Sequence, residues 1–101
     1  MIVYNMSIQI DPLIEKEWVQ WQKQEHIPEV MASAQFVDYK FYRLLEQDET
    51  ESIFYVMQFF AATEGHYKKF IQEYAGDLRQ KAFDRWGDKF IAFRTVMEVV
   101  H

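Results

Sequence analysis

The chain has no cysteine among its 101 residues. Disulfide bonds, thiolate metal sites and a cysteine nucleophile are therefore excluded. Glycine is also scarce, and the three glycines do not form a phosphate-binding loop. No serine or threonine lies in a nucleophile motif. Any catalytic chemistry therefore has to come from other kinds of side chain.

Basic residues are few as well. The 11 Lys and Arg residues against 16 Asp and Glu residues give a formal net charge of −5. Nucleic-acid binding depends on clustered Lys and Arg, so no nucleic-acid partner is expected. No segment approaches the ~20 apolar residues of a membrane span, and no signal-peptide pattern begins the sequence. We expect a cytoplasmic protein with no membrane partner.

Apolar residues, by contrast, are abundant, and aromatic residues make up 18% of the chain. Residues 53–60 read IFYVMQFF, with almost no alternation between apolar and polar. Strand side chains point to opposite faces in turn, so both faces of this strand should be covered. Two helices can cover one face of a four-stranded sheet. A second copy of the chain is expected to cover the other, giving a homodimer through the sheet face.

The rest of the chain alternates between strand and helix patterns. Asp11-Pro12 and Thr63 each mark the start of a helix, and Gly87 marks the end of the second one. Pro28 should break or kink the first helix, so that residues 26–28 join two helical pieces, the second at residues 29–34. Gly76 is a candidate point of division in the second helix. The acidic residues 46–51 are expected to form a turn between two strands. Strands are expected at residues 2–10, 36–45, 53–60 and 90–100, with helices between 11 and 34 and between 63 and 86.

This order is strand, helix, strand, strand, helix, strand. It predicts an α+β fold of the ferredoxin-like βαββαβ plan, with both helices on one face of an antiparallel four-stranded sheet. No linker or repeat divides the chain. We therefore expect a single domain over residues 1–101.

Several short motifs carry a family resemblance: Trp18-x-x-Trp21, Glu25-His26-Ile27-Pro28-Glu29-Val30 and Ala92-Phe93-Arg94. With them the chain resembles a domain-of-unknown-function family of small bacterial proteins in the dimeric α/β-barrel group. That group includes cofactor-free monooxygenases, haem-degrading monooxygenases, muconolactone isomerase and EthD-like proteins. The resemblance implies two ferredoxin-like protomers paired sheet to sheet. The tryptophan, asparagine and histidine arrangement of the haem-degrading members is not placed here, and no cofactor is expected.

His26 is the candidate catalytic residue. Imidazole can transfer a proton near neutral pH, and a helix end interrupted by proline can point it between helices and sheet. The resemblance adds that several members of the group have an aromatic residue and a His-x-Pro at this position, similar to Trp21 and His26-x-Pro28. The alternative is a histidine that only caps a helix C-terminus.

Aromatic residues could line a pocket for a small aromatic ligand next to His26. The alternative is that aromatic residues at helical spacing form an ordinary core. The candidate ligand-binding residues are Trp18, Trp21, Tyr4, Tyr67 and Tyr74.

Two other groupings of charged residues are candidates for a role. Arg94 and Glu98 share one strand face and could form an ion pair at the dimer interface, beside the polar residues of the first strand. The alternative is that they reach water at an edge or end of the strand. Glu25, His26 and Glu29 could bind a metal ion, but Pro28 disrupts their helical spacing, so no metal site is expected.

The sequence therefore supports a cofactor-free small-molecule monooxygenase or isomerase-like enzyme. The alternative is a non-catalytic homodimeric ligand-binding or structural module. An RNA-recognition motif has the same element order, but its basic opening is replaced by Glu51-Ser52, which disfavours it.

Overall fold

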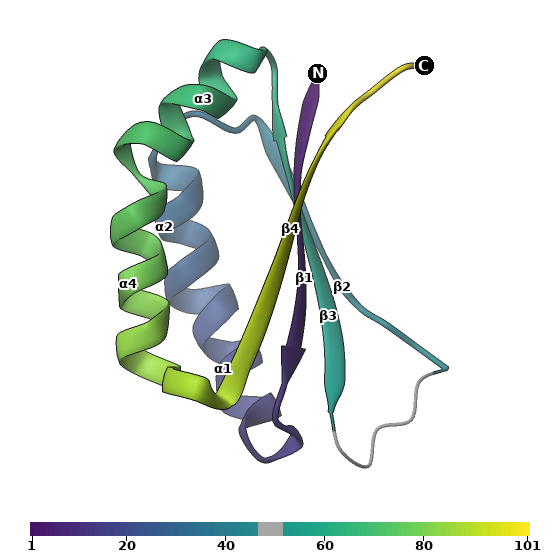
Figure 1. The fold of residues 1–101 in the computed structure, drawn as a ribbon, viewed down its shortest axis with the longest axis vertical. Coiled ribbons are helices and arrows are strands. Elements are labelled where there is room, and N and C mark those ends of the chain that lie inside the picture. The colour runs from purple at the N-terminus through teal and green to yellow at the C-terminus, as the bar shows by residue number, and fades with distance from the viewer. Residues whose placement is uncertain (47–51) are drawn as a thin grey trace.

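The computed structural model describes residues 1–46 and 52–101 as one antiparallel sheet with helices on one face (Figure 1). The strands lie side by side in the order β2-β3-β1-β4. They are β1 (Ile2–Ile10), β2 (Asp38–Arg43), β3 (Ile53–Ala61) and β4 (Phe90–Glu98). The longer helices are α1 (Glu15–Trp21), α2 (Ile27–Ala32), α3 (Glu64–Glu73) and α4 (Ala75–Trp86). The predicted α+β architecture is confirmed.

Strand β1 is one of the two inner strands of the sheet, between β3 and β4, and its side chains alternate between the two faces. Tyr4 lies opposite Phe59 of β3 and opposite Val96 of β4. Its even-numbered residues Tyr4, Met6, Ile8 and Ile10 are buried under the helices. Its odd-numbered residues Asn5, Ser7 and Gln9 face the other side, as predicted.

The helix boundaries follow the predicted capping residues. The Asp11 carboxylate accepts a hydrogen bond from the Leu13 N–H at 2.9 Å, and a short 3₁₀ turn (Pro12–Ile14) then leads into α1. The Thr63 hydroxyl accepts from the His66 N–H at 3.2 Å and starts α3. Gly87 ends α4 with a φ of 59°, a left-handed value that glycine adopts without strain.

The first helix changes its winding before Pro28. Residues Gln22–His26 form one π-helical turn, in which the Ile27 N–H donates to the Gln22 carbonyl, and Pro28 lies in the first turn of α2. Proline cannot donate a hydrogen bond, and its ring presses on the carbonyl four residues earlier. The helix accommodates Pro28 by forming a wider, π-helical turn just before it. The change in helix winding therefore occurs earlier in the chain than predicted. The second helix divides at Tyr74, between α3 and α4, two residues before the predicted Gly76.

Other boundaries differ by a few residues. Strand β2 spans Asp38–Arg43 rather than 36–45, and β4 ends at Glu98 rather than at residue 100. The predicted acidic turn 46–51 lies, apart from Glu46, outside the described residues.

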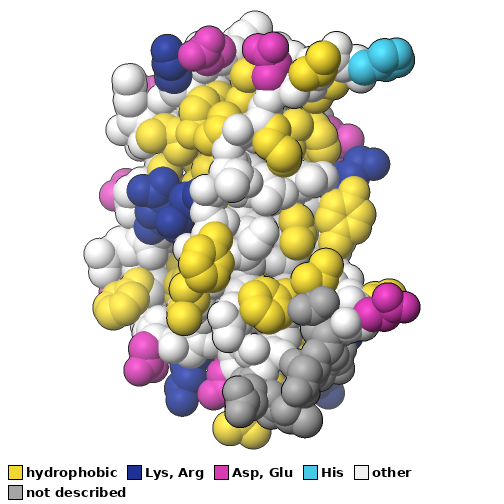
Figure 2. Space-filling model, turned by 45° about the vertical axis from the view of Figure 1, so that its right-hand side comes forward, with side chains coloured by type: hydrophobic (Ala, Val, Ile, Leu, Met, Phe, Trp, Pro, Cys, Tyr) yellow, Lys and Arg dark blue, Asp and Glu magenta, His cyan; other side chains and the backbone are white. Residues whose placement is uncertain are grey.

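The two faces of the sheet are covered unequally. The helices bury one face, where the core side chains of all four strands meet them. On the other face, side chains of β3 and β4 remain in contact with solvent, including Ile91 and Phe93, which are 54% and 56% exposed. Figure 2 brings this side forward and shows hydrophobic side chains spread over it. We call it the open face; its apolar members are Val3, Tyr42, Phe54, Val56, Phe60, Ile91, Phe93 and Met97. No helix in the described parts of the chain is long and apolar enough to cross a membrane.

Candidate active site

A cavity of about 60 Å³ lies between the sheet and the helices. The strands form its floor with Tyr4, Met6, Ile8, Phe59, Phe90 and Arg94. The helices form its walls with Trp18, Trp21, Gln22, His26, Val30, Phe70, Ala75, Leu78, Arg79 and Ala82. Most of this lining is apolar, so the few polar groups decide what the cavity can do chemically.

Gln22 and His26 form a buried polar pair in the cavity wall. The His26 Nδ1 and Gln22 Oε1 atoms are 2.8 Å apart, and the two residues are 7% and 2% exposed. An amide oxygen can only accept, so in this arrangement Nδ1 carries the proton and Nε2 is left as an acceptor. Both residues come from the π-helical turn, a feature often found at functional sites.

Burial sets the charge of His26. Desolvation lowers its pKa to about 4, and the nearby Glu29 carboxylate only partly opposes this. The imidazole is therefore neutral at physiological pH. Its ring stacks on Trp21 with 4.9 Å between centroids, and the edge of Trp86 packs against Trp21. These contacts fix the orientation of the imidazole ring, so its free Nε2 has a defined position.

Two arginines lie where the cavity meets solvent. Arg79 is on α4 and Arg94 is on β4, and both line the cavity while remaining exposed. Arg94 lies opposite Met6 of β1, whose side chain faces the helices. The expectation that Arg94 and Glu98 lie beside Asn5 and Ser7 at the dimer interface is therefore wrong, although the two do share one strand face.

The candidate aromatic residues divide into two groups. Tyr4, Trp18 and Trp21 line the cavity together with His26. Tyr67 packs on the outer side of Tyr4, with 5.7 Å between ring centroids, and Tyr74 stacks on Phe70 at 6.2 Å. Neither Tyr67 nor Tyr74 lines the cavity. The structure thus gathers three of the five aromatic candidates around His26.

A second polar cluster holds α1 against the edge of the sheet. The Glu15 carboxylate accepts hydrogen bonds from Tyr55 Oη at 2.7 Å and from Arg43 Nε at 2.8 Å. These bonds lower the pKa of Glu15, with Arg43 as the larger cause. Burial, with a smaller effect of Glu15, raises the pKa of Tyr55 to about 12. Since none of the three residues lines the cavity, we assign this cluster to the stability of the fold.

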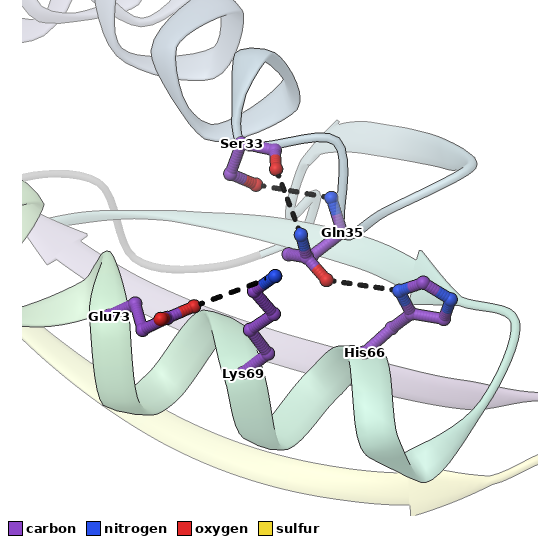
Figure 3. A network of polar contacts seen from close by, with 5 residues as sticks. All are labelled: Ser33, Gln35, His66, Lys69 and Glu73. Carbon is purple, nitrogen blue, oxygen red and sulfur yellow. Dashed lines mark hydrogen bonds and ion pairs between the residues drawn. The ribbon is translucent and has the colours of Figure 1, made fainter.

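A third polar cluster joins the end of α2 to α3 (Figure 3). Gln35 Oε1 lies 2.9 Å from His66 Nδ1, and Gln35 Nε2 donates to the Ser33 carbonyl at 3.0 Å. Figure 3 shows the Gln35 side chain between Ser33 and His66, with the Lys69–Glu73 ion pair farther along α3. Between Ser33 and Gln35 the chain turns at Ala34, which has a φ of 63°. None of these residues lines the cavity, so this cluster also supports the fold.

Comparison with known proteins places the chain in a family. A family model described as "Domain of unknown function (DUF4286)" matches residues 1–100. The chain belongs to this family. The resemblance inferred from the sequence motifs is thereby confirmed, and the family description leaves the function of this DUF4286 chain open. No curated protein matches the chain significantly.

Solved structures similar to the DUF4286 chain share its fold at low sequence identity. One is a dimeric ferredoxin-like protein from an uncultured marine organism, with a TM-score of 0.66 and 10% identity over 99% of this chain and 96% of that one. Another is SnoaB from Streptomyces nogalater, a cofactor-independent oxygenase, with a TM-score of 0.68 and 11% identity over 99% and 94%. The haem degrader MhuD from Mycobacterium tuberculosis has a TM-score of 0.63 and 14% identity over 100% and 97%. At these identities the likeness confirms the ferredoxin-like fold alone.

Three polar residues of the cavity were not singled out for it from the sequence. Gln22 follows Trp18 by four residues, so the helical spacing that selected Trp18 could have selected Gln22 as well. Arg79 directly follows Leu78 on α4, so helical spacing could have identified it as well. No pattern in the sequence could have identified Arg94, because the face on which it lies depends on how β4 is aligned with β1.

Proposed function

We propose that this DUF4286 chain is a cofactor-free enzyme of the monooxygenase or isomerase kind, acting on a small molecule in the cavity between helices and sheet. The observation that carries the proposal is the Gln22–His26 pair. It presents a neutral, oriented imidazole in a largely apolar wall. The cofactor-independent oxygenase SnoaB, which shares the fold, supports the same class of chemistry.

The proposed step is removal of a proton from an acidic C–H bond of the substrate. His26 Nε2 takes the proton, and the electron pair of the broken bond moves to a neighbouring carbonyl oxygen to form an enolate. Where a double bond is conjugated with the enolate, return of the proton to its far carbon gives isomerisation. Alternatively, the α-carbon bonds to dioxygen and takes up a proton to form a hydroperoxide, and loss of water, with the second hydrogen of that carbon, leaves a new carbonyl group, so that one oxygen atom enters the product and the other leaves in water. Imidazolium is unfavourable in the empty cavity, where the pKa of His26 is about 4. The negative charge of an enolate beside it would raise that pKa, so charge separation is stabilised only during the reaction.

The aromatic candidates take ligand-binding roles in this proposal. Tyr4, Trp18 and Trp21 would contact the substrate, because they line the cavity with His26. Tyr67 and Tyr74 would not contact the substrate but would position the residues that do, by packing on Tyr4 and on Phe70. A haem does not fit, because the cavity measures about 60 Å³ and pockets for drug-sized ligands already need roughly 300–1,000 Å³.

We further propose that the working unit is a homodimer paired through the open face. Contiguous apolar surface of this kind is rare on monomers and marks interaction sites. The apolar members of the open face come from all four strands and form a continuous surface, as an interface core requires. The dimeric ferredoxin-like protein of the same fold supports a second copy as the occupant. The cavity lies on the opposite side of the sheet, so it stays open to ligands in such a dimer.

Proton transfer can be tested without knowing the natural substrate. Cyclohexanone and acetophenone are incubated in D₂O with wild-type protein, His26→Gln or His66→Gln, and deuterium at the α-carbon is followed by NMR. We expect exchange with wild-type protein to be faster than in buffer alone, and exchange with His66→Gln to be as fast as with wild-type protein. In His26→Gln, the rate enhancement over buffer should be at least about 100-fold smaller. Equal rates for His26→Gln and wild-type protein, or no exchange above buffer, would contradict the proposal.

The small cavity favours a second candidate, the non-catalytic homodimeric module. At about 60 Å³ it has room for a few water molecules but not for a complete aromatic ring, unless side chains move. A module of this kind would give no deuterium exchange. It would also show no change in melting temperature with a panel of small aromatic compounds, whereas an enzyme whose cavity opens would be stabilised by some of them.

A further inference from the structure

We infer that the molecule bound in the cavity is a small carboxylic acid, whose apolar end enters the cavity and whose carboxylate is bound by Arg79 and Arg94. This inference deepens the proposed function and rests on it. It names the class of ligand, which neither the family description nor the related structures supply.

The first argument is the position of the two guanidinium groups. Arg79 and Arg94 come from different elements, α4 and β4, yet both line the same cavity and both reach solvent. They therefore flank its opening. An arginine side chain binds a carboxylate through two parallel N–H donors, so two arginines at one opening form a favourable site for such a group.

The second argument is that neither arginine pairs with another side chain in the part of the chain that the structure describes. Arg79 and Arg94 make no ion pair or side-chain hydrogen bond with any residue that the structure describes. The chain has an excess of acidic residues, with a net charge of −5, and its other basic side chains include several that pair with carboxylates. Two unpaired cations beside an apolar cavity are thus available to a ligand.

The third argument is the hydroxyl group of Tyr4. The Tyr4 side chain lines the cavity and is only 3% exposed, yet its hydroxyl has no hydrogen-bond partner among residues 1–46 and 52–101. Among the described residues, the fully buried polar atom without a partner is Trp86 Nε1 and not the Tyr4 hydroxyl. The Tyr4 hydroxyl therefore reaches solvent in the cavity and can donate a hydrogen bond to a ligand there. Burial raises the pKa of Tyr67, which packs on Tyr4, and Arg79 lies close enough to Tyr67 to oppose part of that rise. A carboxylate oxygen could accept from Tyr4 while it binds Arg79.

The size of the cavity limits the rest of the ligand. The volume of about 60 Å³ is less than half of the roughly 150 Å³ of an apolar cavity that binds benzene. The ligand is therefore a short-chain acid, or a single-ring acid whose ring enters only as lining side chains move, and its carboxylate stays at the opening beside the arginines. Because Arg94 faces the helices and not the open face, the proposed dimer leaves this opening accessible.

Benzoate and benzamide provide a matched pair of probes, because they have the same shape and differ in charge. Each is titrated into the ¹⁵N-labelled full-length protein, and the backbone amide signals are followed by NMR. With wild-type protein, we expect benzoate to shift signals around Arg79, Arg94 and Tyr4, with at least about tenfold higher affinity than benzamide. In the Arg79→Gln/Arg94→Gln variant, benzoate should fall to the affinity of benzamide.

A control variant separates local binding from overall charge. Lys16→Gln/Lys23→Gln removes the same two positive charges from exposed positions that line no part of the cavity, and should keep the preference for benzoate. Loss of the preference in this control, or its survival in the arginine variant, would overturn the inference. Benzoate shifts confined to residues away from the cavity would also overturn it.

The two proposals can fail separately. Equal binding of benzoate and benzamide in the cavity would refute the carboxylic acid but leave the deuterium-exchange test of His26 unaffected. Strong benzoate binding combined with no proton exchange would support the ligand class and refute the enzyme. A failure of benzoate to bind would refute the ligand class, whatever the exchange experiment showed.

Discussion

The two faces of the sheet have similar composition on β3 and very different surroundings. Ile53, Tyr55, Met57 and Phe59 point toward the helices and are buried. Phe54, Val56 and Phe60, their neighbours in the same strand, point to the open face and remain half-exposed. Burial of apolar side chains is the main favourable contribution to the free energy of folding. The apolar side chains of the open face do not make this contribution in the single chain, because they stay in contact with water. This difference between the two faces is the physical basis of the proposed dimer.

The largest effect is expected on the helix face. Trp18 is 1% exposed and packs its ring against Phe41 and Tyr55 at 5.9 and 5.2 Å between centroids. Trp18→Ala should therefore reduce the free energy of unfolding by about 3–5 kcal/mol, through lost burial and the cavity it leaves. Urea denaturation at fixed protein concentration measures this. Phe83→Ala, at a position 60% exposed, should change it by less than about 0.5 kcal/mol.

The next largest effect is expected in the pH dependence of the free energy of unfolding. It tests whether His26 is as strongly desolvated as its position on the helix face indicates. Its pKa is about 4 in the folded protein and about 6.5 in the unfolded chain. Above pH 6.5 the imidazole is neutral in both states and contributes no pH dependence. As the pH falls from 6.5 to 4, the unfolded chain binds a proton that the folded protein does not, so the free energy of unfolding decreases by up to about 3 kcal/mol.

Comparison with a variant isolates this contribution from that of the carboxylates. The difference in stability between wild-type protein and His26→Gln should shrink or reverse between pH 6.5 and pH 4, as measured by urea denaturation. A pH-independent difference for His26→Gln would mean that the imidazole is much better solvated than its burial implies.

On the open face, a charge should prevent association without unfolding the chain. Phe93 is 56% exposed in the single chain and lies opposite Ser7 in the middle of the open face. Phe93→Glu would bury an unpaired carboxylate in the dimer and should raise the dimer dissociation constant by about 100-fold or more. Sedimentation equilibrium at micromolar concentration should give twice the chain mass of 12.3 kDa for wild-type protein and the single mass for the variant.

The helix side again supplies the control. Phe83→Glu makes the same substitution at an exposed position of α4 and should leave the dimer intact. A wild-type protein that sediments only as a single chain would refute the dimer. Loss of association in Phe83→Glu but not in Phe93→Glu would move the interface to the helices.

How far the sequence predicts this structure depends on whether a feature is local. The alternation of Ile2–Ile10 and the caps at Asp11, Thr63 and Gly87 were all predicted, because each depends on residues that are close in sequence. The face of Arg94 was not, because it depends on the alignment of β4 with β1. A shift of one residue moves every side chain of a strand to the opposite face.

The candidate site was predictable to a similar extent. Tyr4, Trp18, Trp21 and His26 were selected from local patterns and do meet around one cavity. The Gln22–His26 pair depends on the π-helical turn, and the effect of Pro28 on the winding before it could not be predicted from the sequence. The size of the cavity depends on packing between distant elements and was likewise beyond the sequence.

The smallest effect is expected at the edge of the helix face, where a polar contact replaces apolar packing. Tyr55→Phe removes only the hydroxyl that donates to Glu15, and Arg43 remains to pair with this carboxylate. The Glu15 side chain is 30% exposed, so water can replace part of the lost bond, and the free energy of unfolding should fall by about 1 kcal/mol. Tyr42→Phe makes the same change on the open face, at a residue 46% exposed, and should have almost no effect in urea denaturation. If the two variants were equally stable, the Glu15 cluster would contribute nothing to holding α1 on the sheet, and apolar packing alone would account for the closed face.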